Sequence, residues 1–306
     1  MDCTNDIRPF AAEFMNTVGF PHEAKEVFMN AEDAIIADDD LNNLFLRLKR
    51  QFVIENEIPL SCALDELTAI SESCGIHEYT LHFVFVMNCM DVLKDNYVKE
   101  GISEEIFWDT ADDLRCKVLE CKQVKEIWGI FHAPWYRGFF AMTRFALGRM
   151  QFELTDFGHG TYEKNGFIVN NDDIVINMHI PSSGKPFDRE ARLDAYRRAY
   201  KFFHKDTSTP AVFVCHSWLL YKPQTEFLPK GSNILDFMTD FDIITREDGE
   251  SFSNAWRVFG KYAELPPAEL PRDTSLRRAY ADRLVRGEPT GNGFGVFLFD
   301  GENIIR

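Results

Sequence analysis

Polar side chains of the types that transfer protons or attack carbonyl groups stand at the ends of two apolar segments. His179 ends the first segment, and Cys215, His216 and Ser217 stand together near the end of the second. An imidazole can act as a general acid or base, and a thiol beside an imidazole can act as a nucleophile. Adjacent residues of a strand point to opposite faces, so Cys215 and His216 cannot pair with each other in a regular strand. The alternative is a structural role, since cysteine is one of the most frequently buried residue types.

A short turn-forming segment follows the first group. Residues 181–186 read PSSGKP and precede Asp188, a favourable N-cap residue for a helix. A helix N-terminus presents unpaired N–H groups and a positive dipole end, which favour phosphate, and Lys185 adds a positive charge beside the turn. The same composition is typical of an ordinary strand-to-helix connection, and the segment contains neither GxxxxGK[ST] nor GxGxxG.

Two strands and a helix are expected to position these groups. Residues 173–180 alternate with a period of two and are rich in β-branched types, which predicts a strand that ends before Pro181. A helix is predicted to begin near Asp188, with leucine, tyrosine and phenylalanine on one stripe. Residues 211–220 form a short apolar run that indicates a second buried strand. A right-handed crossover would place the two strands side by side and parallel, so that their polar ends approach each other.

Composition limits the classes of function. The chain has 306 residues, which is long enough for two domains of ordinary size. Of these residues 45% are hydrophobic and 27% are charged, a balance typical of globular proteins. A formal charge of −16 argues against nucleic acid binding. No apolar run is long enough to span a bilayer, and the N-terminus lacks signal-peptide features. The seven cysteines show no CxxC spacing, which indicates free thiols in a reducing compartment. We therefore expect a cytoplasmic protein with no metal site and no membrane partner.

The periodicity of the apolar residues changes near residue 135. Residues 1–135 show helical spacing, and the strongly apolar segment 79–98 indicates a buried central helix. Residues 134–147 are predicted to form a linking helix that ends at Gly148. These patterns predict an α+β protein, with an all-helical domain at 1–135 followed by a mixed α/β domain at 136–306.

Alternating polar and apolar residues predict strands from Arg149 onward. Asn165–Gly166 is typical of a hairpin turn within the extended segment 162–170. Residues 233–245 fit either a helix or a strand, and residues 295–299 are predicted to form a last strand.

The order of these elements resembles that of a GNAT-type N-acyltransferase domain. The phrases ALGRMQFEL, HIPSSGKP and FVCHSWLL are also similar to a bacterial family of acyltransferase-domain proteins, in which a helical N-acyltransferase domain precedes a GNAT-like domain. The resemblance covers essentially the whole chain. In the GNAT fold two central parallel strands splay apart, and acyl-coenzyme A lies in the gap with its pyrophosphate on the turn that opens the following helix.

The resemblance implies an acyl-CoA-dependent transferase that moves an acyl group, with acetyl as the first expectation, to a small amine. The pyrophosphate would contact Ser182, Ser183, Gly184 and Lys185. The usual GNAT signature at this place is Q/R-x-x-G-x-G/A, and this segment retains one of its glycines.

Several catalytic roles stay open in this interpretation. Glu153 or His179 is the expected base that removes the proton of the amine, and Ser217 is the expected donor to the leaving thiolate. Alternatively, Cys215 with His179 or His216 would form a covalent acyl-enzyme.

Two other classes of function remain. The first is a non-catalytic GNAT-like module that binds a ligand or a partner protein. The second is a thiol hydrolase or transferase that uses a cysteine and a histidine.

Overall fold

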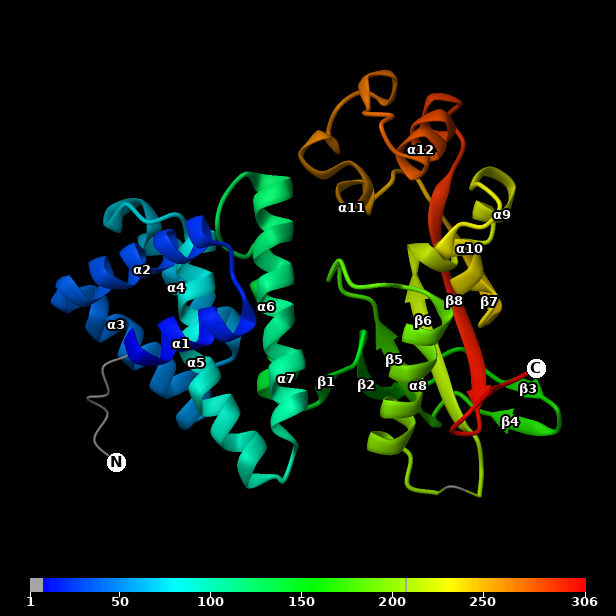
Figure 1. The fold of residues 1–306 in the computed structure, drawn as a ribbon, viewed down its shortest axis with the longest axis horizontal. Helices are drawn as coiled ribbons and strands as arrows, with labels where there is room; N and C mark the ends of the chain where they lie inside the picture. Colours follow the sequence, from blue (N-terminus) through cyan, green and yellow to red (C-terminus); the bar gives the residue numbers. More distant parts are fainter. Residues whose placement is uncertain (1–7, 207) are drawn as a thin grey trace. The chain divides into compact units, whose positions relative to one another are not determined.

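The computed structural model describes residues 8–206 and 208–306, and the chain divides into two compact units between Phe145 and Ala146 (Figure 1). The change of pattern near residue 135 precedes this division. Each unit buries its own apolar core, so the two are described separately.

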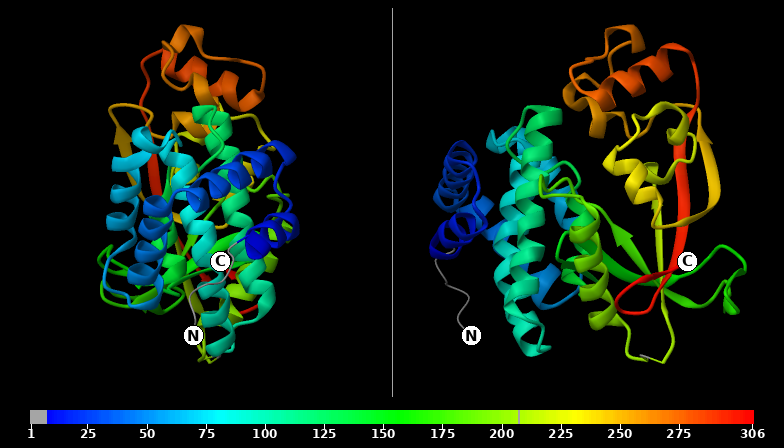
Figure 2. Two further views of the ribbon diagram at one scale, coloured as in Figure 1. Left: turned by 90° about the vertical axis from the view of Figure 1, so that its left-hand side faces the viewer. Right: turned by 45° about the vertical axis from the view of Figure 1, so that its right-hand side comes forward.

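The first unit is built from helices, as predicted. One of them, α5, is buried along most of its length and packs against the other five long helices of the unit, α1, α2, α3, α4 and α6 (Figure 2). Asp38 caps α3, Ser103 caps α6 and Gly75 ends α4 in the left-handed conformation, with φ +69°. The long helices are α1 (Arg8–Val18), α2 (His22–Ala37), α3 (Asp39–Lys49), α4 (Leu60–Cys74), α5 (Glu78–Lys99) and α6 (Glu104–Lys125).

The prediction of a linking helix at residues 134–147 is wrong. A 3₁₀ turn at Ala133–Tyr136 leads into a single helical turn, α7 (Arg137–Phe140). Met142 then adopts a left-handed conformation with φ +50°, which ends helical geometry. The following residues form strand β1 (Arg144–Leu147), which joins the edge of the sheet beside β2. The helical spacing of the apolar residues in this segment therefore gave way to pairing with a neighbouring strand.

The second unit is built around one mixed sheet with the strand order β1-β2-β5-β6-β8-β7. Strands β2 and β5 pair antiparallel, and so do β6 with β8 and β8 with β7. Strand β9 (Ile304–Ile305) adds to β8 beyond this order. The long strands are β2 (Met150–Asp156), β5 (Ile174–His179), β6 (Ala211–Ser217), β7 (Asp242–Gly249) and β8 (Thr290–Phe299).

Strands β5 and β6 are adjacent and parallel, and helix α8 (Arg189–Phe203) connects them, as predicted. Asp188 caps α8 by accepting the N–H of Ala191 at 2.9 Å. Tyr196 of α8 lies against the sheet, with its ring 5.8 Å from that of Phe213 and 4.9 Å from that of Phe297. We call the side of the sheet that α8 covers the helix face.

A two-stranded hairpin covers part of the opposite side, which we call the hairpin face. It consists of β3 (Tyr162–Lys164) and β4 (Phe167–Val169), and the turn between them is the predicted Asn165–Gly166, with φ +52° and +78°. Its side chains Tyr162 and Val169 join a buried apolar cluster on the sheet. The sheet residues of this cluster are Val175, Val214, Phe294, Val296 and Leu298.

Two segments differ from, or complete, the interpretation of the sequence. Residues 233–245 contain both a helix, α10 (Asn233–Met238), and the start of β7. Strand β8 begins at Thr290, before the predicted 295–299, because its glycines serve close backbone approach instead of a turn. A Cβ on Gly293 would lie 2.2 Å from the carbonyl oxygen of Leu220.

The remaining helices build a second apolar cluster of this unit, centred on Phe252, Phe259 and Tyr280. They are α9 (Gln224–Phe227), α11 (Ala255–Phe259) and α12 (Ser275–Val285). No helix among the described residues is both long and apolar enough to cross a membrane.

Candidate functional site

Glu153 and His179 form a hydrogen-bonded carboxylate–imidazole pair on the hairpin face. Their strands β2 and β5 are antiparallel, and Glu153 faces Asn177 in the register, so Glu153, Asn177 and His179 share one side of the sheet. His179 Nε2 lies 2.7 Å from Glu153 Oε1, and Asn177 Nδ2 lies 3.5 Å from the same oxygen. The side chains of His179 and Glu153 are 26% and 20% exposed. A carboxylate in this position fixes the orientation of the imidazole.

His216 and Glu247 form a second such pair on the same face. Asn177 is the register partner of Val214, so the residues two positions further along, His179 and His216, project from the same side. His216 Nε2 lies 2.9 Å from Glu247 Oε2 on β7, and both side chains are about half exposed. Glu247 also lines a polar pocket of about 180 Å³ whose walls include Asp248, Ser253, Asn254, Thr290 and Asn292.

The two histidines flank the place where the parallel strands separate. Within the described residues, β5 and β6 pair at Ile176–Phe213 and Asn177–Val214, and no pairing follows. Both strands nevertheless continue, β5 to His179 and β6 to Ser217. Ligands of open α/β sheets commonly bind beyond the carboxyl ends of the strands, where such a gap opens.

Cys215 lies on the helix face, which agrees with the expectation that it cannot pair with His216 and corrects the pairing with His179 that was considered from the sequence. It points away from both His179 and His216, and its side chain is completely buried. Burial raises the pKa of the Cys215 thiol to about 12, so the thiolate that attacks a thioester is scarce near neutral pH. The geometry supports neither the covalent acyl-enzyme nor the cysteine–histidine hydrolase.

Ser217 ends β6 and starts the next turn. Its Oγ accepts the N–H of Leu219 at 3.2 Å and so caps a 3₁₀ turn, η3 (Trp218–Leu220). A hydroxyl that accepts this bond can still donate its own proton, so the structure leaves a role for Ser217 as a donor chemically available.

The turn between β5 and α8 is exposed and partly bonded to itself. Ser183 donates its N–H to the carbonyl of Pro181 at 2.9 Å, and Lys185 donates its N–H to Ser183 Oγ at 3.3 Å. Gly184 adopts φ +70°, and an added Cβ there would meet no atom within 4 Å. Two of the four amides expected to hold a pyrophosphate are therefore engaged inside the turn.

Two arginines hold the ends of this turn. Arg149 donates from its guanidinium to the carbonyl of Pro181 at 2.9 Å, and Arg192 donates to the carbonyl of Phe187 at 3.3 Å. The ring of Phe187 lies 5.3 Å from the guanidinium carbon of Arg149 and 5.7 Å from that of Arg192. The turn thus has fixed ends and an open middle.

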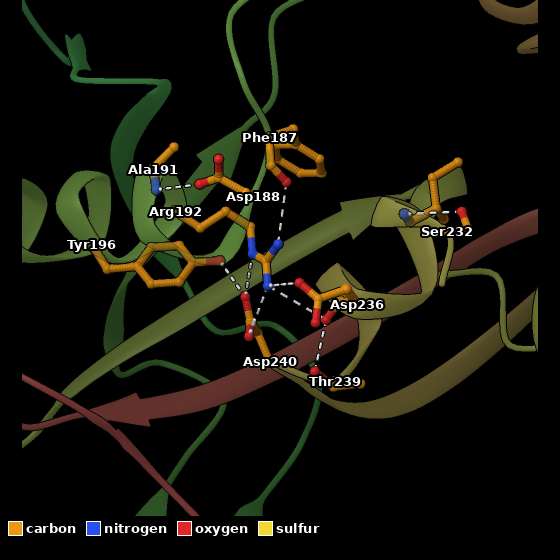
Figure 3. A network of polar contacts seen from close by, with 10 residues as sticks. Phe187, Asp188, Ala191, Arg192, Tyr196, Ser232, Asp236, Thr239 and Asp240 are labelled. Atoms are coloured by element: carbon orange, nitrogen blue, oxygen red, sulfur yellow. Dashed lines mark hydrogen bonds and ion pairs between the residues drawn. The ribbon is translucent and has the colours of Figure 1, made fainter. Parts of the chain in front are cut away.

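Arg192 belongs to a buried network that joins α8 to the segment before β7 (Figure 3). Its guanidinium donates to Asp240 at 2.7 Å and to Asp236 at 2.8 Å, and Tyr196 donates its hydroxyl to Asp240 at 3.0 Å. Burial alone would lower the pKa of Arg192, but the bonds to the two carboxylates outweigh it and raise the pKa. The charge of Arg192 therefore stabilises the fold, and the network fixes where α8 begins.

Sequence reasoning missed three parts of this site, namely Asn177, Glu247 and the clamp residue Arg149. Asn177 was visible as a polar residue inside an apolar strand, two positions before His179. Glu247 and Arg149 carried no local signal, because each meets its partner across a strand or turn that is distant in sequence. Among the described residues, no three His, Cys, Asp or Glu side chains gather as a metal site would require.

Comparison with known proteins identifies both halves of the chain. Residues 9–142 match the N-acyltransferase N-terminal domain, and residues 145–297 match the GNAT-like C-terminal domain. No curated protein matches the chain.

Solved acyltransferase structures share the fold over most of the chain. An acyltransferase in complex with decanoyl-CoA and teicoplanin is 20% identical, with a TM-score of 0.71 over 94% of this chain and 87% of that chain. An acyltransferase mutant in complex with octanoyl-CoA is 19% identical, with a TM-score of 0.70 over the same shares. At such identities the likeness shows the fold. Together with the two domain matches, it leads to one conclusion: the chain belongs to the family in which an N-acyltransferase N-terminal domain precedes a GNAT-like C-terminal domain.

Proposed function

We propose that this protein is an acyl-CoA-dependent N-acyltransferase that acylates a primary amine. The observation that carries the proposal is the Glu153–His179 pair at the end of β5, beside the point where β5 and β6 stop pairing. A thioester placed in that gap would have an oriented imidazole next to its carbonyl. The family supports this interpretation, because its GNAT-like domain matches residues 145–297, which contain the whole arrangement.

His179 is the base in this proposal, and Glu153 positions it. The amine attacks the thioester carbonyl, His179 takes the proton that the nitrogen loses, and the C–S bond breaks to release coenzyme A. Glu153 stabilises the imidazolium that forms, through the 2.7 Å contact at Nε2. Because both side chains are mostly shielded from water, this stabilisation exceeds that of a fully exposed ion pair.

The pyrophosphate of the acyl-CoA would lie on the turn formed by Ser182, Ser183, Gly184 and Lys185. The start of α8 supplies a positive dipole end there, and Lys185 supplies a charge. The Ser183 and Lys185 amides already donate within the turn, so the Lys185 side chain would contribute more than in a glycine-rich loop. The acyl chain of the donor is proposed to be longer than acetyl, by analogy with the octanoyl and decanoyl donors in the similar structures.

Calorimetric titration with acetyl-, octanoyl- and decanoyl-CoA tests the proposal. We expect the octanoyl or decanoyl donor to bind more tightly than acetyl-CoA. Lys185→Glu should weaken binding by at least about tenfold, which corresponds to about 1.4 kcal/mol, and the loss should shrink at high salt. Lys205→Glu is the matched control, since it makes the same charge change beyond the other end of α8.

Lack of binding of all three donors at millimolar concentration would contradict the enzymatic proposal. The fold would then be that of a non-catalytic GNAT-like module. An equal loss in the Lys185 and Lys205 variants would leave the enzyme intact but remove the turn as the pyrophosphate site.

A further inference from the structure

The proposed reaction has two proton tasks, and the base described above performs one of them. The nitrogen must lose a proton, and the sulfur of the leaving group must gain one. Ser217 was the donor expected from the sequence, yet it stands two positions after Cys215 in β6 and therefore on the face opposite to His179 and His216.

We propose that His216, held by Glu247, is the acid that protonates the departing thiolate. This inference rests on the proposed acyltransferase function. It follows from the symmetry of the gap, because His179 and His216 each stand two residues beyond the last paired positions of β5 and β6, on the same face. A thioester in the gap therefore has one imidazole–carboxylate pair on each side.

The two imidazole–carboxylate pairs differ in solvent exposure, and this difference assigns the role of the acid to His216 and that of the base to His179. The Glu153–His179 pair is mostly shielded, whereas the side chains of His216 and Glu247 are 49% and 50% exposed. An acid that gives up its proton in each turnover must recover one from water. His216 can do so directly, and the polar pocket beside Glu247 has room for water molecules.

The step balances as follows. The nitrogen–carbon bond forms while the nitrogen gives a proton to His179, and the carbon–sulfur electron pair moves to sulfur. Sulfur takes a proton from His216, so that coenzyme A leaves as a thiol. His179 then releases its proton to solvent, and His216 takes one up.

A comparison of two donors tests this role. Octanoyl-CoA and the thiophenol ester of octanoic acid are supplied with hydroxylamine as the acceptor, and the release of thiol above the uncatalysed background is measured. Thiophenol is a more acidic thiol than coenzyme A, so its thiolate leaves without help from an acid. A variant that lacks the acid should therefore fail with the first donor and recover with the second.

We expect His216→Asn to lower kcat with octanoyl-CoA by about 100-fold and to come within a few-fold of the wild type with the thiophenol ester. Glu247→Gln should show the same pattern with a smaller loss, about tenfold, because it weakens the hold on His216 without removing it. His179→Asn should be impaired with both donors. His204→Asn, whose Nε2 lies 2.9 Å from the carbonyl oxygen of Thr209 at the end of α8, should match the wild type.

Three results would overturn the inference. If the wild type transfers from octanoyl-CoA and His216→Asn does so equally well, His216 is not the acid, while the acyltransferase proposal stands. An equal loss of His216→Asn with both donors indicates a structural role. If the wild type transfers from neither donor, the proposed function fails, and this inference fails with it.

Discussion

Residues 215 and 216 are neighbours in the sequence and differ completely in their chemistry. Cys215 lies on the helix face, where α8 and the aromatic core exclude water, and burial raises the pKa of its thiol to about 12. His216 lies on the hairpin face, half exposed and 2.9 Å from a carboxylate. The comparison teaches that the side of the sheet, and not the residue type, decides which group can exchange protons.

The charges of the two faces also serve different purposes. On the helix face, Arg192 is fully buried and forms ion pairs with Asp240 and Asp236, and these pairs stabilise the folded state. On the hairpin face, both imidazole–carboxylate pairs keep contact with solvent. We therefore expect substitutions in the two imidazole–carboxylate pairs to change the rate and substitutions in the Arg192 network to change the stability.

The largest expected effect is on the rate. His179→Asn should lower kcat by about 10²- to 10⁴-fold, because it removes the general base. Glu153→Gln should lower kcat by a smaller factor, since the imidazole of His179 remains. Measured unfolding free energies should stay close to that of the wild type in both variants. A large loss of stability without a loss of rate in the folded fraction would erase the distinction between the faces.

The next effect is on stability. Arg192→Ala leaves the buried carboxylate of Asp240 without its cation, and removing one partner of a buried pair costs about 3–5 kcal/mol. Urea unfolding measures this. Arg198→Ala on the same helix breaks an exposed pair with Asp194 and should cost less than about 1 kcal/mol. Similar losses in the two variants would show that the Arg192 network is not the anchor of α8.

A smaller effect concerns the hairpin and depends on pH. Burial alone would raise the pKa of Asp242, but hydrogen bonds from Lys164 and Tyr162 of β3 outweigh it and lower the pKa below 3.8. A carboxylate with a lowered pKa stabilises the folded state above its unfolded value, and this contribution is lost as the pH falls through the folded value.

Asp242→Asn should therefore be less stable than the wild type at pH 7, by about 1 kcal/mol or less, because the pair is partly screened. The difference should shrink as the pH falls below the ordinary range of an aspartate and should be lost as the pH falls through the lowered pKa of Asp242 in the folded protein. Unfolding free energies measured from pH 7 to pH 3 test this, and a difference that does not change with pH would contradict it.

The smallest expected effect is at Cys215. Cys215→Ala should change kcat by less than about twofold, since a catalytic cysteine would lose far more. In the folded protein, iodoacetamide at pH 8 should label the exposed Cys62 and spare Cys215, whose pKa of about 12 leaves little thiolate. Mass spectrometry of peptides after labelling measures the extent of modification at Cys62 and at Cys215. A large loss of activity in Cys215→Ala would contradict this expectation and would support the covalent acyl-enzyme mechanism.

Much of the fold was determined by local patterns in the sequence. Helical spacing of the apolar residues predicted that the first unit is helical, and the strongly apolar segment 79–98 predicted its buried central helix, because this signal acts within a few residues. The strand, turn and helix from Ile174 to Phe203 were predicted for the same reason, and the crossover rule then predicted that β5 and β6 are parallel. The helix predicted at residues 134–147 was wrong, because pairing of residues 144–147 with the neighbouring strand β2 overrode the helical spacing.

The candidate site depended on contacts that the sequence does not display. His179 and Glu153 were each named as a base from the sequence, but their pairing depends on the antiparallel register of β2 and β5. Glu247 reaches His216 because β7 and β6 both pair with β8. Strand parity predicted that Cys215 and His216 face opposite ways, but burial by α8 decided which of them stays in contact with water. Side-chain periodicity is local, whereas register and burial depend on which distant segments pack together.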